Sequence, residues 1–71
     1  MVSIIIATET IRLSQLLKLV NVVQDGGEAK FRIANREVMV NGEVEIRRGR
    51  KLRPGDRVEF DGETYEIVAG V

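Results

Sequence analysis

The spacing of hydrophobic residues changes along the chain, and each segment of constant spacing predicts a different element. Residues 2–8 contain the uninterrupted apolar run Ile4, Ile5 and Ile6, whose β-branched side chains suit a strand better than a helix. A strand without alternating polar residues is typical of burial on both faces. We therefore expect a short N-terminal strand that is buried within the fold.

Residues 13–20 have apolar residues three or four positions apart, which is the spacing of one helical face. The residues on this face are Leu13, Leu16, Leu17 and Val20. Ser14 has a hydroxyl that can accept a hydrogen bond from a helix N-terminal amide, so we expect it to be the N-cap. This first helix should end near Asn21.

A second helix is predicted from Asp25 to about residue 35. Asp25 is a good N-cap, and Glu28 can reach back to the cap amide, as in a capping box. Ala29 and Ile33 are four residues apart and should share the buried face of this helix.

Other residues of the second helix point away from its buried face. Lys30 and Arg32 project to either side of that face. Phe31 falls nearly opposite Ile33, so it is either covered by another element or offered to a ligand. We favour the covered position.

From residue 38 onward apolar and polar residues alternate, which predicts strands. Asn41-Gly42 separates the strands expected at 38–40 and 44–46. Both turn residues tolerate the positive φ angles of a tight type I′ turn.

Two further turns complete the β half of the chain. Pro54-Gly55 fits the central positions of a type II turn. Asp61-Gly62 joins the last two expected strands, at 57–60 and 64–68. The order of elements predicts an α+β fold, in which two short helices pack on a small, mainly antiparallel sheet with an N-terminal strand.

Length and composition limit what the chain can be. Seventy-one residues supply one modest core, so we expect residues 1–71 to form a single domain. The absence of Cys and His removes disulfides, the usual zinc and haem ligands and the commonest general base, and we expect no metal and no cofactor. The longest apolar run is too short to span a bilayer, and the N-terminus lacks the organisation of a signal peptide. We therefore expect a cytoplasmic protein.

Charge is distributed unevenly although the formal net charge is zero. Residues 12–53 carry ten Lys and Arg against five Asp and Glu, a balance of +5, and the rest carry one against six, a balance of −5. The densest segment, 47–53, has five basic residues and no acid among them. Like charges this close repel one another. Because the helices add further basic residues, a polyanionic partner explains the segment better than a solvated loop does.

The sequence carries no enzyme motif. It has neither a phosphate-binding loop that ends in Gly-Lys-Ser/Thr nor a nucleophile paired with His. Gly26-Gly27 opens a helix without the further glycines or the lysine of a nucleotide-binding loop. Acidic pairs such as Glu43 and Glu45 follow the alternation of a strand, so we expect them to face solvent and not to act as an acid–base pair.

Five segments carry a resemblance to a known domain. They are residues 11–18 (IRLSQLLK), 26–30 (GGEAK), 38–43 (VMVNGE), 47–52 (RRGRKL) and 55–58 (GDRV). Over about residues 11–60 the chain resembles the alpha-L RNA-binding motif, the domain named after the fourth small-subunit ribosomal protein. It looks most like the short stand-alone bacterial forms of the YaaA and YbcJ type.

The resemblance implies that the two helices and the following hairpin dock on structured RNA of the rRNA or tRNA type, with the ribosome as an expected partner. By position, the expected contacts are Arg12, Lys18, Lys30 and the segment 47–51. The family often has Ser-Arg where this chain has Gly26-Gly27, which removes one basic contact. With the other basic residues of the helices and the loop, the predicted RNA-binding residues are Arg12, Lys18, Lys30, Arg32, Arg36, Arg47, Arg48, Arg50, Lys51 and Arg53.

Two other functions remain open from the sequence. Sulfur-carrier proteins of the ubiquitin-like β-grasp type have similar Val-Asn-Gly-Glu and Gly-Asp segments, but they work through a C-terminal Gly-Gly, whereas this chain ends Ala69-Gly70-Val71. A protein-interaction adaptor would bind a basic partner through the acidic residues of 56–66. We rank non-catalytic RNA binding first, and expect neither a membrane partner nor a small-molecule substrate.

Overall fold

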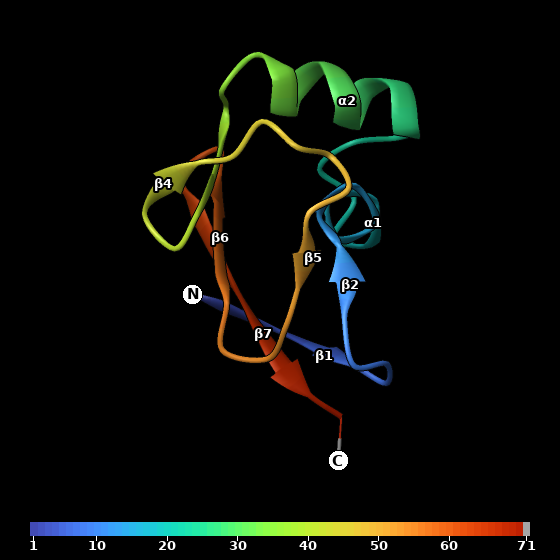
Figure 1. The fold of residues 1–71 in the computed structure, drawn as a ribbon, viewed down its shortest axis with the longest axis vertical. Coiled ribbons are helices and arrows are strands. Elements are labelled where there is room, and N and C mark those ends of the chain that lie inside the picture. The colour runs from blue at the N-terminus through green and yellow to red at the C-terminus, as the bar shows by residue number, and fades with distance from the viewer. Residues whose placement is uncertain (71) are drawn as a thin grey trace.

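The computed structural model describes residues 1–70, which form two helices and two sheets (Figure 1). In chain order the elements are β1 (Val2–Ile6), β2 (Ile11–Arg12), α1 (Leu13–Leu19), α2 (Gly26–Ala34), β3 (Val38–Val40), β4 (Glu43–Val44), β5 (Lys51–Leu52), β6 (Arg57–Phe60) and β7 (Glu63–Ala69). The larger sheet has the strand order β1-β7-β6-β3-β4, and β2 pairs with β5 in the smaller one. Within the described residues, β1 and β7 are parallel and the other pairs are antiparallel. The predicted α+β fold is confirmed.

The N-terminal strand β1 forms one edge of the larger sheet, beside β7. Ile6 is buried, but Ile5 is 69% exposed and Val2 is 40% exposed. The prediction that this strand is buried on both faces is therefore wrong. In a chain this small, too little material remains after one core is filled to cover the outer face of an edge strand.

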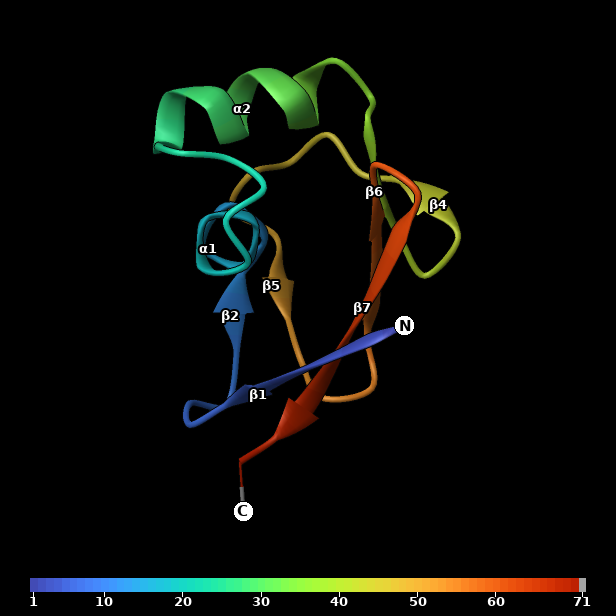
Figure 2. The ribbon, with the colours of Figure 1, turned by 180° about the vertical axis from the view of Figure 1, so that it is seen from behind.

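Both helices and several strands contribute to one hydrophobic core. Its largest fully buried side chains are Leu13, Leu16, Leu17, Ile33, Val38, Val40, Leu52, Val58 and Ile67. The apolar face predicted for the first helix is confirmed, and Val20 at its end is partly buried. In Figure 2, α1 is seen end-on and α2 lies across it, so the helices meet at a corner. Neither helix of the described part of the chain is long and apolar enough to cross a membrane.

Helix α1 begins without a side-chain cap from Ser14. Its N-cap is Arg12, and Ser14 lies in its first turn. The backbone amides of Leu13 and Ser14 donate to the carbonyl oxygens of Arg50 and Arg48, at 2.9 and 3.1 Å. The prediction of Ser14 as N-cap is wrong because the helix begins before it: carbonyls of a distant segment bind the amides of Leu13 and Ser14, and both residues belong to the first turn.

Helix α2 begins with the predicted N-cap. Asp25 Oδ1 accepts a hydrogen bond from the backbone amide of Glu28 at 2.8 Å. The Glu28 side chain reaches back one residue further than a capping box requires, and accepts a hydrogen bond from the amide of Gln24 at 2.7 Å. Ala29 and Ile33 are buried, as their spacing predicted.

Both helices are followed by a residue in the left-handed conformation. The φ angle is 61° at Asn21 after α1 and 62° at Arg36 after α2. The amide of Arg36 donates to the carbonyl of Ile33, and the amide of Glu37 donates to that of Arg32. This pair of bonds is a Schellman motif, and the same pattern closes α1.

The tight turns of the β half follow the sequence prediction. Asn41 and Gly42 have φ angles of 52° and 85°, and Asp61 and Gly62 have 56° and 81°. These values fit hairpin turns that need a positive φ at both central residues. Gly55 has a φ of 99°, as the second central residue of a type II turn requires.

Candidate nucleic-acid interface

A backbone framework beside α1 gathers basic residues that are far apart in the sequence. β2 and β5 pair so that Arg12 lies opposite Lys51. Before β5, residues 47–50 form a turn, the basic turn, in which the amide of Arg50 donates to the carbonyl of Arg47 at 3.2 Å. Because carbonyl groups of the basic turn also bind the first amides of α1, the turn is fixed beside the start of the helix. The fold thus brings Arg12, at the start of the basic residues 12–53, beside the segment 47–51 near their end.

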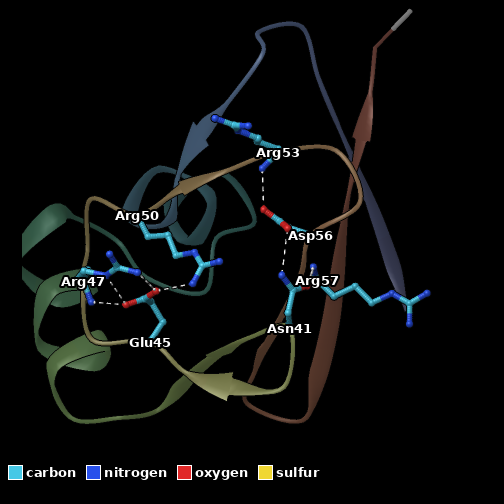
Figure 3. A network of polar contacts seen from close by, with 7 residues as sticks. All are labelled: Asn41, Glu45, Arg47, Arg50, Arg53, Asp56 and Arg57. Atoms are coloured by element: carbon cyan, nitrogen blue, oxygen red, sulfur yellow. Dashed lines mark hydrogen bonds and ion pairs between the residues drawn. The ribbon is translucent and has the colours of Figure 1, made fainter.

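A buried carboxylate holds the basic turn from inside (Figure 3). Glu45 is 5% exposed. Its Oε2 accepts hydrogen bonds from the backbone amide and the Nε of Arg47, both at 3.0 Å. Its Oε1 accepts from Arg47 Nη2 at 3.1 Å and from Arg50 Nη1 at 2.8 Å. The segment 47–53 therefore does have a neutralising acid, which the count of charges along the sequence missed.

The hydrogen bonds to Glu45 favour its ionised form. The bonds from the Arg47 side chain lower the pKa of Glu45 most, burial opposes them, and Arg50 and the Arg47 amide lower it further, to about 2. The same contact raises the pKa of Arg47 above its ordinary value. The Glu45 carboxylate and the guanidinium groups of Arg47 and Arg50 form one ion network.

The prediction that Glu45 faces solvent is wrong because the β3–β4 hairpin turns Glu45 inward and Val44 outward, the reverse of the expected arrangement. Met39 lies opposite Val44 in the β3–β4 pair, so these two side chains share a face. The amide of Glu45 donates to the carbonyl of Val38, which is buried. Glu45 therefore projects to the core side, whereas Val44 is 49% exposed. Hydrophobicity alone assigns Val44 to the core, but the pairing register of the hairpin places Glu45 there instead.

A second polar cluster fixes the chain after β5 (Figure 3). Asp56 accepts a hydrogen bond from the Arg53 backbone amide at 2.9 Å and one from Asn41 Nδ2 at 3.0 Å. Asn41 Oδ1 accepts a bond from the amide of Arg57 at 2.9 Å. Burial raises the pKa of Asp56, but the bonds from Arg53 and Asn41 outweigh it, and the pKa is lowered. These contacts hold the backbone of Arg53 in place.

Arg32 faces an acidic part of the molecule. Its Nη1 lies 2.8 Å from Glu37 Oε1, its Nη2 lies 4.0 Å from Glu28 Oε2, and its guanidinium lies 5.8 Å from the ring centre of Phe60. The hydrogen bond and the charge of Glu37 raise the pKa of Arg32. Hydrogen bonds from Asn35 and then Arg32 lower the pKa of Glu37. Arg32 is thus already neutralised by acids of its own surroundings.

Phe31 is 65% exposed on α2. The prediction that another element covers it is wrong. Ala29 and Ile33 turn the helix toward the core, and Phe31 lies on the side away from it. An exposed aromatic therefore stands next to the exposed Lys30.

Comparison with known proteins identifies the kind of domain that carries this arrangement. The profile of the S4 domain family matches residues 4–68. The chain belongs to the S4 domain family.

Relatives of this S4 domain cover most of its length. The "Probable ribosome maturation protein RlbA" of Bacillus subtilis (strain 168) is 54% identical over 64 residues, which are 89% of this chain and 90% of RlbA. YbcJ of Escherichia coli (strain K12) is 39% identical over 59 residues, 83% of this chain and 84% of YbcJ. The solution structure of YbcJ, described as revealing an alpha-L motif involved in RNA-binding, is similar with a TM-score of 0.72 and 34% identity. This similarity covers 97% of this chain and 89% of that one, and it confirms the predicted family and fold.

The predicted site residues of this S4 domain fall into two groups. Among residues 1–70, Arg32, Arg47 and Arg50 form ion pairs with acids. The predicted residues that are exposed and have no ion pair within the described chain are Arg12, Lys18, Lys30, Arg36, Arg48, Lys51 and Arg53. Sequence alone does not separate these groups, because Glu45 and Glu37 meet their partners only in the fold.

The start of α2 in this S4 domain presents glycine in place of a basic side chain. Gly26 and Gly27 are both exposed. A Cβ added to Gly26 would meet no atom within 4 Å, whereas one added to Gly27 would lie 3.3 Å from Oδ1 of the N-cap Asp25. This chain has no side chain at either position with which to contact a partner.

Acidic residues gather on a different part of this S4 domain. Glu59, Asp61 and Glu63 line a hollow of about 200 Å³ at the β6–β7 hairpin, together with Glu37. In Figure 1 this hairpin and the α1–β2–β5 region lie on opposite sides of the view. No group of acids in the described residues has the arrangement of a metal site. The acids of the β6–β7 hairpin therefore lie apart from the basic turn, whereas Glu45 and Glu37 lie among basic residues.

Proposed function

We propose that the protein is a non-catalytic RNA-binding protein that docks on structured RNA through contacts with backbone phosphates. The observation that carries this proposal is the joining of Arg12, Lys51 and the basic turn beside the start of α1. A rigid backbone holds these cations in one place, which lowers the entropy lost when they meet phosphates. Basic residues that come from several elements of one compact domain are typical of a phosphate-binding footprint.

Its relatives support RNA as the partner. RlbA is named as a ribosome maturation protein, and the motif of YbcJ is described as involved in RNA-binding. The chain is similar to both over most of its length. We therefore propose rRNA, or an RNA of similar structure such as tRNA, as the target, and association with ribosomal particles in the cytoplasm as the setting.

The side-chain chemistry suits recognition of RNA shape rather than sequence. Duplex RNA hides its base edges in a deep, narrow major groove and offers phosphates and 2′-hydroxyls instead. Arginine predominates in the segment 47–53, and guanidinium groups form forked hydrogen bonds with phosphate. The sequence has two Phe, one Tyr and no Trp, which is too few aromatics for a stacking platform along a single strand.

The proposed contact residues are the exposed cations that have no ion pair within the described chain. Around the basic turn they are Arg12, Arg48, Lys51 and Arg53, and on the helices they are Lys18, Lys30 and Arg36. The cations lie on several elements that meet at a corner, and a folded RNA, which holds its phosphates in fixed positions, can meet several of them at once.

Fluorescence-anisotropy titrations test the proposal. An RNA hairpin, an unstructured single strand of equal length and a DNA duplex are titrated at several salt concentrations. A variant with Arg12, Arg48, Lys51 and Arg53 changed to Ala is compared with the wild type and with the control Arg57→Ala, whose side chain pairs with Glu66 at 3.8 Å on β7. Each lost phosphate contact should reduce the slope of log affinity against log salt by roughly 0.7 to 0.9.

Preference of the wild type for the hairpin, with a shallower salt slope in the quadruple variant and an unchanged slope in Arg57→Ala, would support RNA docking. Absence of RNA binding at low salt would refute it. The acidic β6–β7 hairpin would then make a protein adaptor the better interpretation, and its partner would remain bound in a pull-down after nuclease treatment. Family membership favours either interpretation over a sulfur-carrier protein.

A further inference from the structure

The basic turn and Lys51, which follows it directly, contain two kinds of cation, although these residues are neighbours in the sequence. The guanidinium groups of Arg47 and Arg50 are bound to Glu45 at 2.8 to 3.1 Å. Arg48 and Lys51 are exposed and have no ion pair among residues 1–70. Exposure alone does not separate the two kinds, since the Arg47 side chain is 71% exposed.

Glu45 is placed to control the geometry of the turn as well as its charge. It bonds the backbone amide of Arg47, where the turn begins, and the side chain of Arg50, where the turn ends. Its carboxylate is nearly inaccessible to solvent, so these bonds replace the water that an ionised group otherwise needs. An apolar residue at this position would leave two guanidinium groups free to move and to repel each other.

We propose that Glu45 is a positioning residue that sets the specificity of the RNA-binding surface: it retains Arg47 and Arg50 within the protein and presents Arg48 and Lys51 to phosphates in a fixed geometry. This inference rests on the proposed function of RNA binding. A guanidinium group that already binds a carboxylate gains little from a phosphate and releases few counterions on binding. The surface therefore carries fewer usable charges than its sequence suggests, but holds them more rigidly, which favours a folded RNA over a flexible polyanion.

A pair of single substitutions tests the division of the cations. Arg47→Gln and Arg48→Gln remove the same charge from adjacent, exposed positions. Arg48→Gln should reduce the salt slope for the RNA hairpin by roughly 0.7 to 0.9, and Arg47→Gln by less than about 0.3. Equal reductions in the two variants would overturn the division. Circular dichroism spectra of both variants are recorded before the titration, to check that they are folded.

A second pair tests the role of Glu45 itself. Glu45→Gln and Glu43→Gln change the net charge equally, and Glu43 is exposed. In Glu45→Gln the released arginines should bind phosphates, so the salt slope becomes steeper by roughly 0.7 to 1.8. Affinity for the single strand should rise, and the preference for the hairpin over the single strand should fall fivefold or more. In Glu43→Gln that preference should stay within twofold of the wild type.

The outcomes separate this inference from the proposed function. Loss of affinity for both RNAs alike in Glu45→Gln, without a steeper salt slope, would mean that Glu45 only stabilises the fold, and would overturn the inference. Wild-type binding with identical behaviour of the Glu45→Gln and Glu43→Gln variants would also overturn it, while RNA binding itself stood. A wild type that binds no RNA would remove the proposed function. If Glu45→Gln does not fold, the comparison of Arg47→Gln with Arg48→Gln decides.

Discussion

Replacement of Glu45 by Gln should destabilise the protein at neutral pH and have progressively less effect in acid. The pKa of Glu45 falls from 4.5 to about 2 in the folded protein, because guanidinium groups and an amide bind its ionised form. At about 1.36 kcal/mol for each pH unit between the two values, the ionised carboxylate contributes about 3 kcal/mol to the free energy of unfolding. For Glu45→Gln we expect a loss of roughly 2 to 3 kcal/mol in the free energy of unfolding. The loss is no larger than the carboxylate's contribution because Gln keeps the shape of the side chain and one hydrogen-bond acceptor.

The direction of the pH dependence follows from the lowered pKa. A group whose folded pKa lies below its unfolded pKa stabilises the protein above the unfolded value and loses that effect as the pH falls through the folded value. The difference between wild type and Glu45→Gln should therefore be constant above about pH 5.5 and shrink between about pH 5 and pH 2. Asp56 and Glu37, whose pKa values are also lowered, contribute to the acid sensitivity of both proteins and cancel in the difference.

Urea denaturation followed by far-ultraviolet circular dichroism measures this difference, since the chain has no Trp and a single Tyr. Domains of this size have only about 3 to 5 kcal/mol of stability, so sucrose, which does not titrate, is added equally to all samples to keep a folded baseline. Glu43→Gln is the control, and should change the free energy of unfolding by less than about 0.5 kcal/mol at every pH. A difference for Glu45→Gln below about 0.5 kcal/mol at pH 7, or one that does not change with pH, would refute the reasoning.

Further predictions concern packing, caps and the exposed aromatic, all measured by the same denaturation assay. Leu17→Ala should lower the free energy of unfolding by about 2 to 5 kcal/mol, because Leu17 is fully buried. A decrease below about 1 kcal/mol would contradict its assignment to the core. Asp25→Ala should lower the free energy of unfolding by about 1 kcal/mol, because it removes the cap on the Glu28 amide. Asp25→Asn keeps a capping oxygen and should retain most of this stability. Arg36→Gly should raise the free energy of unfolding by about 1 kcal/mol, because glycine adopts the left-handed φ of 62° without the strain of a side chain. Arg36→Ala should not raise it. Phe31→Ala should change the free energy of unfolding by less than about 0.5 kcal/mol, and a larger cost would mean that the ring is packed after all.

Local patterns in the sequence were sufficient for most of the fold. The spacing of Leu13, Leu16 and Leu17 predicted a helix, since residues three and four apart share one helical face. The Asp61-Gly62 dipeptide predicted a hairpin, because few residues adopt positive φ angles without strain. Asp25 predicted a helix start through a contact only three residues long. Each of these signals acts between neighbours in the chain, so no knowledge of the tertiary structure was needed.

The composition of the candidate surface was also visible in the sequence, but its organisation was not. The excess of Lys and Arg in residues 12–53 indicated a polyanionic partner, and family membership agrees with the resemblance that the motifs carried. The sequence did not show that Arg12 lies opposite Lys51, or that carbonyls of the basic turn bind the amides of Leu13 and Ser14 at the start of α1. Both contacts join segments more than thirty residues apart, and they depend on how the chain returns to α1.

Only the tertiary structure decided which charges are available. The phase of the β3–β4 hairpin turns Glu45 inward, where it binds Arg47 and Arg50, and a shift of one residue would turn it outward. The sequence determines that positive charge is present, because charge is a property of residues. Which of those charges remains free is a property of pairing, because a carboxylate neutralises whatever the fold places within about 3 Å of it.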